Sequence, residues 1–520
     1  MGKCGKKGLA VRCFYFTKLL AAIFFTYYVA FRLFTLALVS DEWGSIMTDL
    51  AGGKCLVDLL VFSHATAQTH FLQTLLSIGF ANILSESQII SAARLPSLIG
   101  FGLYLFSCWK ITERLESKVL NVIGFVALCS NAFVLDYFGL ARGYGLAIGF
   151  TALSLFFFIE SMSGGKERCT PNIWKTLSVW SASFAVLCNM AFANFYFGIA
   201  FVCMCSSMDT GFFKSGFVKS VRSFLITNGY LFANAGLLFV FYLPRVLLMY
   251  DSLYFGGTNG FVKDTVCSLV KSSFYRRDIP EGIPLIIAYV LGVASVVMSV
   301  LLVLEKKKTR SMPPSSGLYL SMIISIMALF NIAGFYLAGI KFVIERAALS
   351  FLPVFILQVI LFISESTQSR RKLGYAVLLL CILLGIHGLN FKRTGDYCAY
   401  SQTPELLNDL VRIHQETGKM VVLGVTDSTK YTLGWYAEKQ AGLSENPKTK
   451  SYISGPVKQF QWLVIYSLDY AVPSDGPLHY FPETTHIALQ RYILPSKVPC
   501  KLKLLKEYPY ARTRLYEVEP

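Results

Sequence analysis

The chain has 520 residues, of which 54% are hydrophobic and only 15% are charged. A soluble protein carries about 25% charged residues, so this composition excludes a soluble globular protein and indicates a polytopic membrane protein. The 42 Phe and 28 Tyr, against only 18 Pro, also exclude a disordered chain.

The net charge of +17 is compatible with three interpretations. They are the basic cytoplasmic side of a membrane protein, capture of a phosphorylated substrate, and nucleic-acid binding. The basic residues lie mainly between apolar runs, which favours the first interpretation and predicts no nucleic-acid partner.

Apolar runs long enough to cross a membrane follow one another along the chain. The first covers about 14–40 and follows the basic segment MGKCGKKGLAVR. It is too long for the core of a cleaved signal peptide, so we expect a retained helix with a cytoplasmic N-terminus. The others bring the total to about eleven predicted spans, at about 94–110, 119–135, 142–160, 174–190, 191–206, 223–244, 283–304, 316–338, 346–364 and 373–391. One broken span over 174–206 is the alternative to two short helices there.

The loop charges support this topology, because every short loop on the N-terminal side of the membrane is basic. The opposite side has two long loops, 41–93 and 245–282, and a polar tail. We therefore predict a mainly α-helical membrane domain over 1–391 and a small extracytoplasmic α/β domain over 392–520. In the tail, an amphipathic helix is expected at 406–415 and strands at 421–425, 462–467 and 514–518.

Thirteen Cys show no paired spacing and no nearby His, so a zinc site is not expected. Cys398 and Cys500 lie in the tail, and a disulfide between them would be allowed on an oxidising side of the membrane. Two unpaired thiols are the alternative.

Ionisable residues collect near the outer ends of the predicted spans. Asp41 and Glu42 directly follow the first span, where a lowered dielectric makes a carboxylate a candidate general base. A solvated helix end is the alternative for this pair. His70 precedes the amphipathic segment 71–84, which is expected to lie on the bilayer, and a structural histidine is the alternative there.

The remaining outer segments combine acidic residues with cations that could bind a phosphate. Asp136 and Arg142 flank a turn between two spans, either as site residues or as a mutual ion pair. Gly256, Gly257 and Gly260 allow close backbone approach to a ligand. The candidate cations are Lys263, Arg276, Arg277, Lys341 and Arg346, with Glu345 beside the last.

Several of these segments resemble the GT-C superfamily of integral-membrane glycosyltransferases. The resemblance lies in Asp41-Glu42, in Arg94-Leu95-Pro96-Ser97 at the start of the second span, and in Ala141-Arg142-Gly143-Tyr144 at the start of the fourth. The branch most similar contains protein O-mannosyltransferases, the lipid A aminoarabinose transferase and bacterial relatives. The chain departs from it in having Gln68-Thr69-His70 where a His-Pro-Pro segment is common.

This resemblance implies an inverting transfer of a sugar from a polyprenyl-phosphate donor to an unidentified glycan, lipid or protein acceptor at the outer face. It implies Asp41 as general base, with Glu42 second, and Asp136 as a further catalytic residue. Arg142 and Arg346, then Lys263, Arg276 and Arg277, would bind the donor phosphate, and His70, Tyr144 and Glu345 would contact substrate.

Cationic side chains on the phosphate make a metal dispensable, although Mg²⁺ is compatible, and no other cofactor is expected. The bacterial inner membrane is the expected location. The alternative from another class is a polytopic transporter or lipid flippase, which needs ionisable residues along a path through the middle of the membrane.

Overall fold

The computed structural model describes residues 2–51, 70–162, 171–207, 227–249, 256–275, 279–280, 282–309, 315–425, 427–439, 457–467, 484–491 and 501–519. The chain forms two compact units. The first contains Met1–Phe34 and Thr48–Leu389, and the second contains Thr35–Met47 and Asn390–Pro520.

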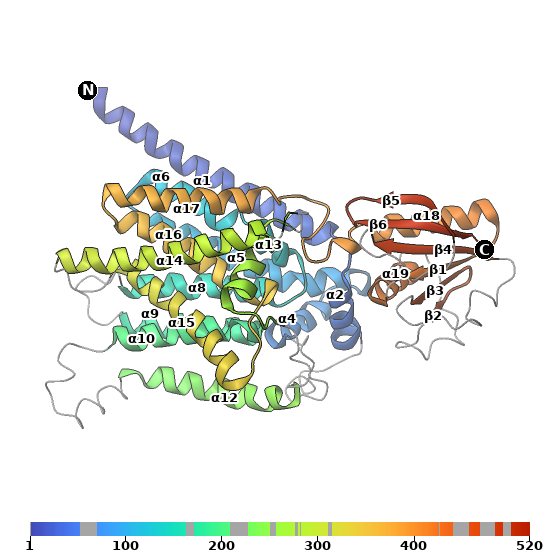
Figure 1. The fold of residues 1–520 in the computed structure, drawn as a ribbon, viewed down its shortest axis with the longest axis horizontal. Coiled ribbons are helices and arrows are strands. Elements are labelled where there is room, and N and C mark those ends of the chain that lie inside the picture. The colour runs from blue at the N-terminus through green and yellow to red at the C-terminus, as the bar shows by residue number, and fades with distance from the viewer. Residues whose placement is uncertain are drawn as a thin grey trace. The chain divides into compact units, whose positions relative to one another are not determined.

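The first unit is helical, and its long helices run alongside one another (Figure 1). Its α-helices are α1 (Gly2–Thr35), α4 (Phe71–Ala81), α5 (Ile89–Glu113), α6 (Lys118–Cys129), α7 (Ala132–Asp136), α8 (Tyr144–Met162), α9 (Pro171–Cys188), α10 (Ala193–Ser206), α12 (Gly229–Met249), α13 (Cys267–Ser273), α14 (Gly282–Thr309), α15 (Ser316–Ala338), α16 (Phe351–Glu365) and α17 (Gln368–Ile386). Short turns of other helical type are η1 (Ile46–Ala51), η2 (Glu86–Gln88), η3 (Tyr137–Gly139), η4 (Met190–Phe192), η6 (Val262–Val266) and η7 (Glu345–Ala348).

Six helices of the described residues are long and apolar enough to cross a membrane, or seven if the bent pair of α6 with α7–η3 is one span. They lie in α1, α5, α8, α14, α15 and α16 with η7. The structure thus supports an integral, multi-pass membrane protein. Helices also form at the predicted runs of α9, α10, α12 and α17, but these are shorter or less apolar. Eleven full-length spans are therefore not confirmed.

Asparagine caps explain the two breaks within apolar runs. The predicted span at 119–135 bends by 55° after α6, where the Asn131 side chain accepts a hydrogen bond from the Val134 amide at 3.1 Å. Asn189 accepts one from the Ala191 amide at 3.0 Å, and this cap separates α9 from α10. An Asn side chain satisfies the free amides of a helix start, so each break is encoded locally. Two helices, α9 and α10, thus form over 174–206, and their assignment as two separate spans stays a prediction.

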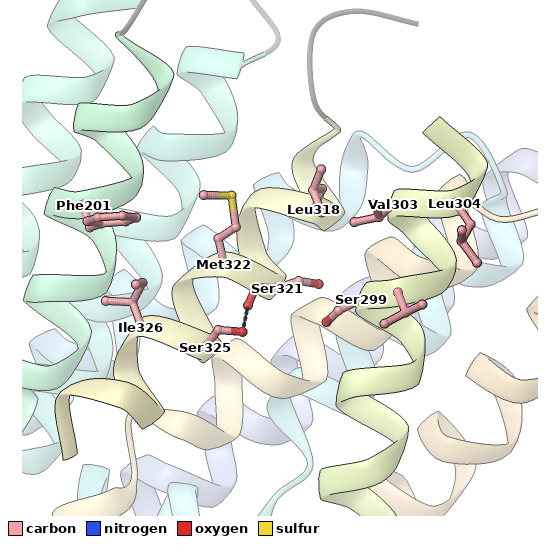
Figure 2. A pocket seen from close by; sticks show the side chains of 10 residues that line it. Phe201, Ser299, Val303, Leu304, Leu318, Ser321, Met322, Ser325 and Ile326 are labelled. Carbon is pink, nitrogen blue, oxygen red and sulfur yellow. Dashed lines mark hydrogen bonds between the residues drawn. The ribbon is translucent and has the colours of Figure 1, made fainter. Parts of the chain in front are cut away.

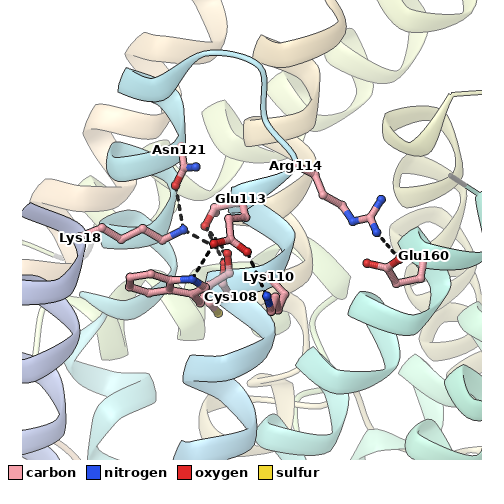
Figure 3. Close-up of polar contacts among 9 residues, drawn as sticks. Lys18, Cys108, Lys110, Glu113, Arg114, Asn121 and Glu160 are labelled. Atoms are coloured by element: carbon pink, nitrogen blue, oxygen red, sulfur yellow. Dashed lines mark hydrogen bonds and ion pairs between the residues drawn. The ribbon is translucent and has the colours of Figure 1, made fainter. Parts of the chain in front are cut away.

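Polar contacts join the middle of α1 to the end of α5 and the start of α6 (Figure 3). The buried Lys18 of α1 donates to Asn121 Oδ1 at 2.8 Å and to the Trp109 carbonyl at 3.1 Å. Its ammonium group also lies 4.4 Å from the centre of the Trp109 ring. These partners compensate a charge that burial would otherwise penalise. Next to them, Arg114 forms an ion pair with Glu160.

The amphipathic segment predicted at 71–84 is the helix α4. Its polar side chains face the protein, because Gln73 and Ser77 are buried and both donate to the Ala93 carbonyl of α5, at 2.8 and 3.1 Å. The apolar side of this helix is therefore turned away from α5, and its position on the bilayer stays a prediction.

The second unit is built on a six-stranded sheet with the order β2-β3-β1-β4-β6-β5. Its strands are β1 (Met420–Val425), β2 (Val457–Gln459), β3 (Leu463–Ser467), β4 (Thr484–Arg491), β5 (Lys501–Tyr508) and β6 (Thr513–Glu519), and its helices are α2 (Ser40–Ser45), η8 (Cys398–Tyr400), α18 (Thr403–Thr417) and α19 (Asp427–Lys439). Strand β1 pairs in parallel with β3 and β4, which accounts for the continuous apolar run VVLGV. The helix and three strands predicted in the tail are confirmed.

Candidate active site

The start of α8 brings three of the predicted site residues together. Arg142 and Tyr144 are buried on either side of Gly143, whose φ is +33°. A Cβ at Gly143 would lie 2.3 Å from the Cys188 carbonyl oxygen and 2.8 Å from the His70 Cβ, so only glycine fits there. The His70 ring consequently packs beside that of Tyr144, with centroids 5.7 Å apart.

The break between α9 and α10 connects this group to the segment that carries Arg346. Cys188 is the last residue of α9, and η4, which follows it, packs against η7. The hydroxyl of Ser350, just after η7, contacts Asn194 Oδ1 of α10 at 3.2 Å. Glu345 and Arg346, both half-buried, therefore lie on a segment that packs against the α9–α10 break.

Glu345 has a left-handed backbone conformation, with φ at +49°. Its amide donates to Ser268 Oγ of α13 at 2.8 Å, which holds the strained turn in place. Non-glycine residues in this region cost of order 1–3 kcal/mol and persist where surrounding contacts impose them, often at functional sites.

Asp136 is held in a buried network that the sequence did not predict. Its Oδ1 accepts from the Arg32 guanidinium of α1 at 2.6 Å and from the Tyr275 hydroxyl at 2.7 Å. Arg32 also contacts the Tyr28 hydroxyl. Burial, together with the adjacent Asp136 carboxylate, raises the pKa of Tyr275 well above its usual range, so its hydroxyl remains a donor. Asp136 was expected either to act in the site or to pair with Arg142, and the structure adds Arg32 as an ion-pair partner.

Arg32 could have been found from the sequence, because an arginine inside the apolar run VAFRLF is costly and therefore needs a partner. Tyr275 left no such signal. Its φ is +57°, and its ring lies against Gly388, where a Cβ would approach within 2.9 Å. The tyrosine is thus oriented by contacts that form only in the folded chain.

The glycine-rich loop closes on its own chain. Asp264 Oδ2 accepts hydrogen bonds from the amides of Asn259 and Gly260, at 2.6 and 3.1 Å. Gly257 exchanges two backbone hydrogen bonds with Phe342, at 2.9 and 3.0 Å. The close backbone approach expected at these glycines is therefore made to internal groups, and a carboxylate occupies the anion-binding amides.

Of the three candidate phosphate-binding cations near this loop, the structure describes one. Lys263 is exposed on η6, beside the loop. Arg276 and Arg277 lie outside the described residues. A role for these three in binding phosphate stays a prediction.

Asp41 and Glu42 belong to the second unit, in α2. Asp41 is half-buried, and its Oδ2 accepts from the Tyr397 hydroxyl at 2.8 Å, while the neighbouring Ser40 contacts the Tyr400 hydroxyl at 2.9 Å. Glu42 is fully buried, and its Oε2 accepts from the Val39 amide at 3.3 Å, which caps its own helix. Asp41 is therefore the more accessible carboxylate of the pair.

Two further predictions concern disulfides and metals. Cys398 is a free thiol, and Cys500 lies outside the described residues. Within the described part of the chain, no three His, Cys, Asp or Glu side chains group as a metal site. Metal-independent chemistry stays a prediction, as does a cavity shared by Asp41, Asp136, Arg142 and Arg346.

Neither a protein-family model nor a curated protein matches this sequence. Among solved structures, the chain is similar to ArnT from Cupriavidus metallidurans bound to undecaprenyl phosphate, with 11% identity, a TM-score of 0.43, and coverage of 98% of this chain and 97% of that one. It is also similar to an oligosaccharyltransferase from Archaeoglobus fulgidus in complex with Zn and sulfate, with 12% identity, a TM-score of 0.41, and coverage of 80% of this chain and 61% of that one.

Proposed function

We propose that this protein is a membrane glycosyltransferase that moves a sugar from a polyprenyl-phosphate donor to an acceptor at the outer membrane face. One observation carries the proposal: the buried Arg142 with its neighbours His70 and Tyr144, and the η7 turn with Arg346, both adjoin the α9–α10 break. Two guanidinium groups near helix ends suit a phosphate at the membrane interface, because the guanidinium fork matches phosphate oxygens.

The proposed reaction is a single displacement. The acceptor oxygen forms a bond to the anomeric carbon, the bond from that carbon to the lipid phosphate breaks, and the configuration inverts. The acceptor proton passes to the carboxylate of Asp41, with Glu42 as second choice, and the lipid phosphate leaves with the bonding electron pair. General-base assistance of this kind contributes roughly 10²–10⁴-fold to the rate.

In this scheme, Arg142 and Arg346 stabilise the charge that develops on the departing phosphate, with Lys263, Arg276 and Arg277 as further candidates. A fixed donor at such a position contributes roughly 3–4 kcal/mol. His70, Tyr144 and Glu345 are the proposed substrate contacts, and Asp136 is a candidate for orienting a substrate or a site residue.

The test is a transfer assay with the purified full chain in nanodiscs and a radiolabelled polyprenyl-phosphate sugar, with cell-envelope extract as the source of acceptor. Arg142→Ala and Arg346→Ala are each expected to lower transfer by roughly 10²-fold. Arg371→Ala is the matched control, because Arg371 lies at the start of α17, on the side of the basic loops, and donates to the Ser366 carbonyl at 2.9 Å.

Wild-type protein that transfers no sugar from any such donor would contradict the proposal. If the labelled lipid instead crosses the bilayer in liposomes that contain the protein, the transporter or flippase alternative is correct.

A further inference from the structure

A hollow lies in the first unit, between α10, α14 and α15 (Figure 2). Its volume is about 360 Å³, within the range of small-molecule sites. It is lined by residues from the last part of α14 and the first half of α15, whereas η7 follows the other end of α15. The α10–α14–α15 groove is thus separate from the candidate active site.

The rim of this groove is apolar and exposed. Phe201 of α10 and Val300, Val303 and Leu304 of α14 are all more than a third exposed, although each lines the groove. α14 and α15 are both candidate membrane spans, and only 22% and 28% of their apolar windows are buried inside the protein. The groove therefore opens toward hydrocarbon, and its occupant has to come from the bilayer.

Three serines line the groove, yet they do not require a polar ligand. Ser299, Ser321 and Ser325 each donate to the carbonyl four residues earlier on their own helix, at 2.8, 3.0 and 2.9 Å. The buried Gln358 donates to the hydroxyls of Ser299 and Ser321, at 3.1 and 2.9 Å. Because every hydroxyl proton is already used, this wall accepts an apolar chain without leaving a donor unsatisfied.

A basic run of the sequence follows the groove beyond Leu304. The run Lys306-Lys307-Lys308 follows within one turn, and Lys307 is exposed. Two carboxylates of the described residues lie near this end: Glu305, which is bound by Arg370 at 3.2 Å, and Glu365, whose Oε1 accepts a hydrogen bond from the Gly317 amide at 3.0 Å. Exposed lysines directly beyond a membrane span attract anionic lipid head groups.

We propose that the α10–α14–α15 groove binds one acyl chain of an anionic phospholipid, whose phosphate contacts the exposed Lys307. The lipid comes from the leaflet that faces this basic loop. The site is independent of the proposed sugar transfer, and its occupant is a membrane lipid rather than a substrate.

The test uses phosphatidylglycerol with a photoactivatable diazirine on one acyl chain and the full chain in phosphatidylcholine nanodiscs. After irradiation, mass spectrometry locates the labelled peptides. Label is expected to concentrate on 299–304 and 318–326, and unlabelled phosphatidylglycerol should compete while phosphatidylcholine does not.

A matched pair of variants tests the groove itself. Val300→Trp fills it, and about tenfold less label is expected, which corresponds to the loss of roughly two buried methylene groups. Val293→Trp is the control, because Val293 is 61% exposed on α14 and does not line the groove. It should leave labelling unchanged.

Label spread evenly over all lipid-facing helices of the wild-type protein would overturn the proposal, and this result does not depend on how any variant folds. Equal competition by phosphatidylcholine would overturn the assignment of an anionic head group. A dimer by native mass spectrometry that dissociates in Val300→Trp would show that a second copy of the chain fills the groove instead.

Discussion

The buried ion pair of Arg32 and Asp136 is predicted to stabilise the first unit by an amount that can be measured. Their side chains are 0% and 2% exposed, and 2.6 Å separates the guanidinium nitrogen from the carboxylate oxygen. Arg32→Met removes the guanidinium and leaves the Asp136 carboxylate buried, while the Tyr275 hydroxyl still donates to it at 2.7 Å. Removing one partner of a buried ion pair costs about 3–5 kcal/mol, or roughly 10²–10³·⁵-fold in the unfolding equilibrium.

The same network predicts graded effects for other changes. Tyr275→Phe removes one hydrogen bond to a charged group and should cost about 1.5–3 kcal/mol. Replacing both charges together, as Arg32→Met with Asp136→Leu, should restore most of the stability, because apolar side chains can replace a buried ion pair at little or no cost. Unfolding in mixed detergent, followed by tryptophan fluorescence, measures each value.

The double variant also separates two roles of Asp136. If Asp136 acts in the transfer reaction, the double variant should be stable and inactive in the transfer assay. If it only holds the helices together, the variant should be stable and active. A cost below about 1 kcal/mol for Arg32→Met would refute the reasoning, because that value is typical of an exposed pair.

Three further changes have defined outcomes. Gly143→Ala should destabilise the protein by about 1–3 kcal/mol, because the new Cβ would meet neighbouring atoms at 2.3 and 2.8 Å. Gly102→Ala is the control, because no atom lies within 4 Å of a Cβ there. Its thermal unfolding should be unchanged or shifted to a higher temperature. Asp41→Asn should lower sugar transfer by roughly 10²–10⁴-fold and leave donor binding unchanged. Glu42→Gln should mainly lower the free energy of unfolding, by about 1 kcal/mol. Equal losses of transfer in both variants would contradict the assignment of Asp41 as the general base. Burial raises the pKa of Tyr508 above its ordinary value of 10.0, so the folded unit retains a proton that the unfolded chain releases. Its unfolding free energy should therefore fall above about pH 10, by up to about 1.4 kcal/mol per pH unit, and Tyr508→Phe should remove this slope in urea unfolding followed by circular dichroism.

The helices and three of the six described strands followed from local properties of the chain. The apolar run predicted at 316–338 is α15, Ser316–Ala338, and the run at 421–425 is β1. The break between α9 and α10 was also predictable, because Asn189 caps a helix through an amide two residues away. The hydropathy of a segment, the residues that cap a helix and the spacing of apolar residues are all read from near neighbours in the sequence. They therefore predict helices and strands without knowledge of the fold.

The partners of the ionisable residues depended on the folded structure. Asp136 pairs with Arg32, 104 residues earlier, and Asp41 contacts Tyr397, 356 residues later. The glycine-rich loop, predicted to approach a ligand, binds its own Asp264. Which groups come within 3 Å of one another is decided by how helices and turns pack, and a hydropathy pattern contains no distances between distant segments. The sequence alone therefore determined which elements form and which residues are chemically able to act, while packing decided which of them meet.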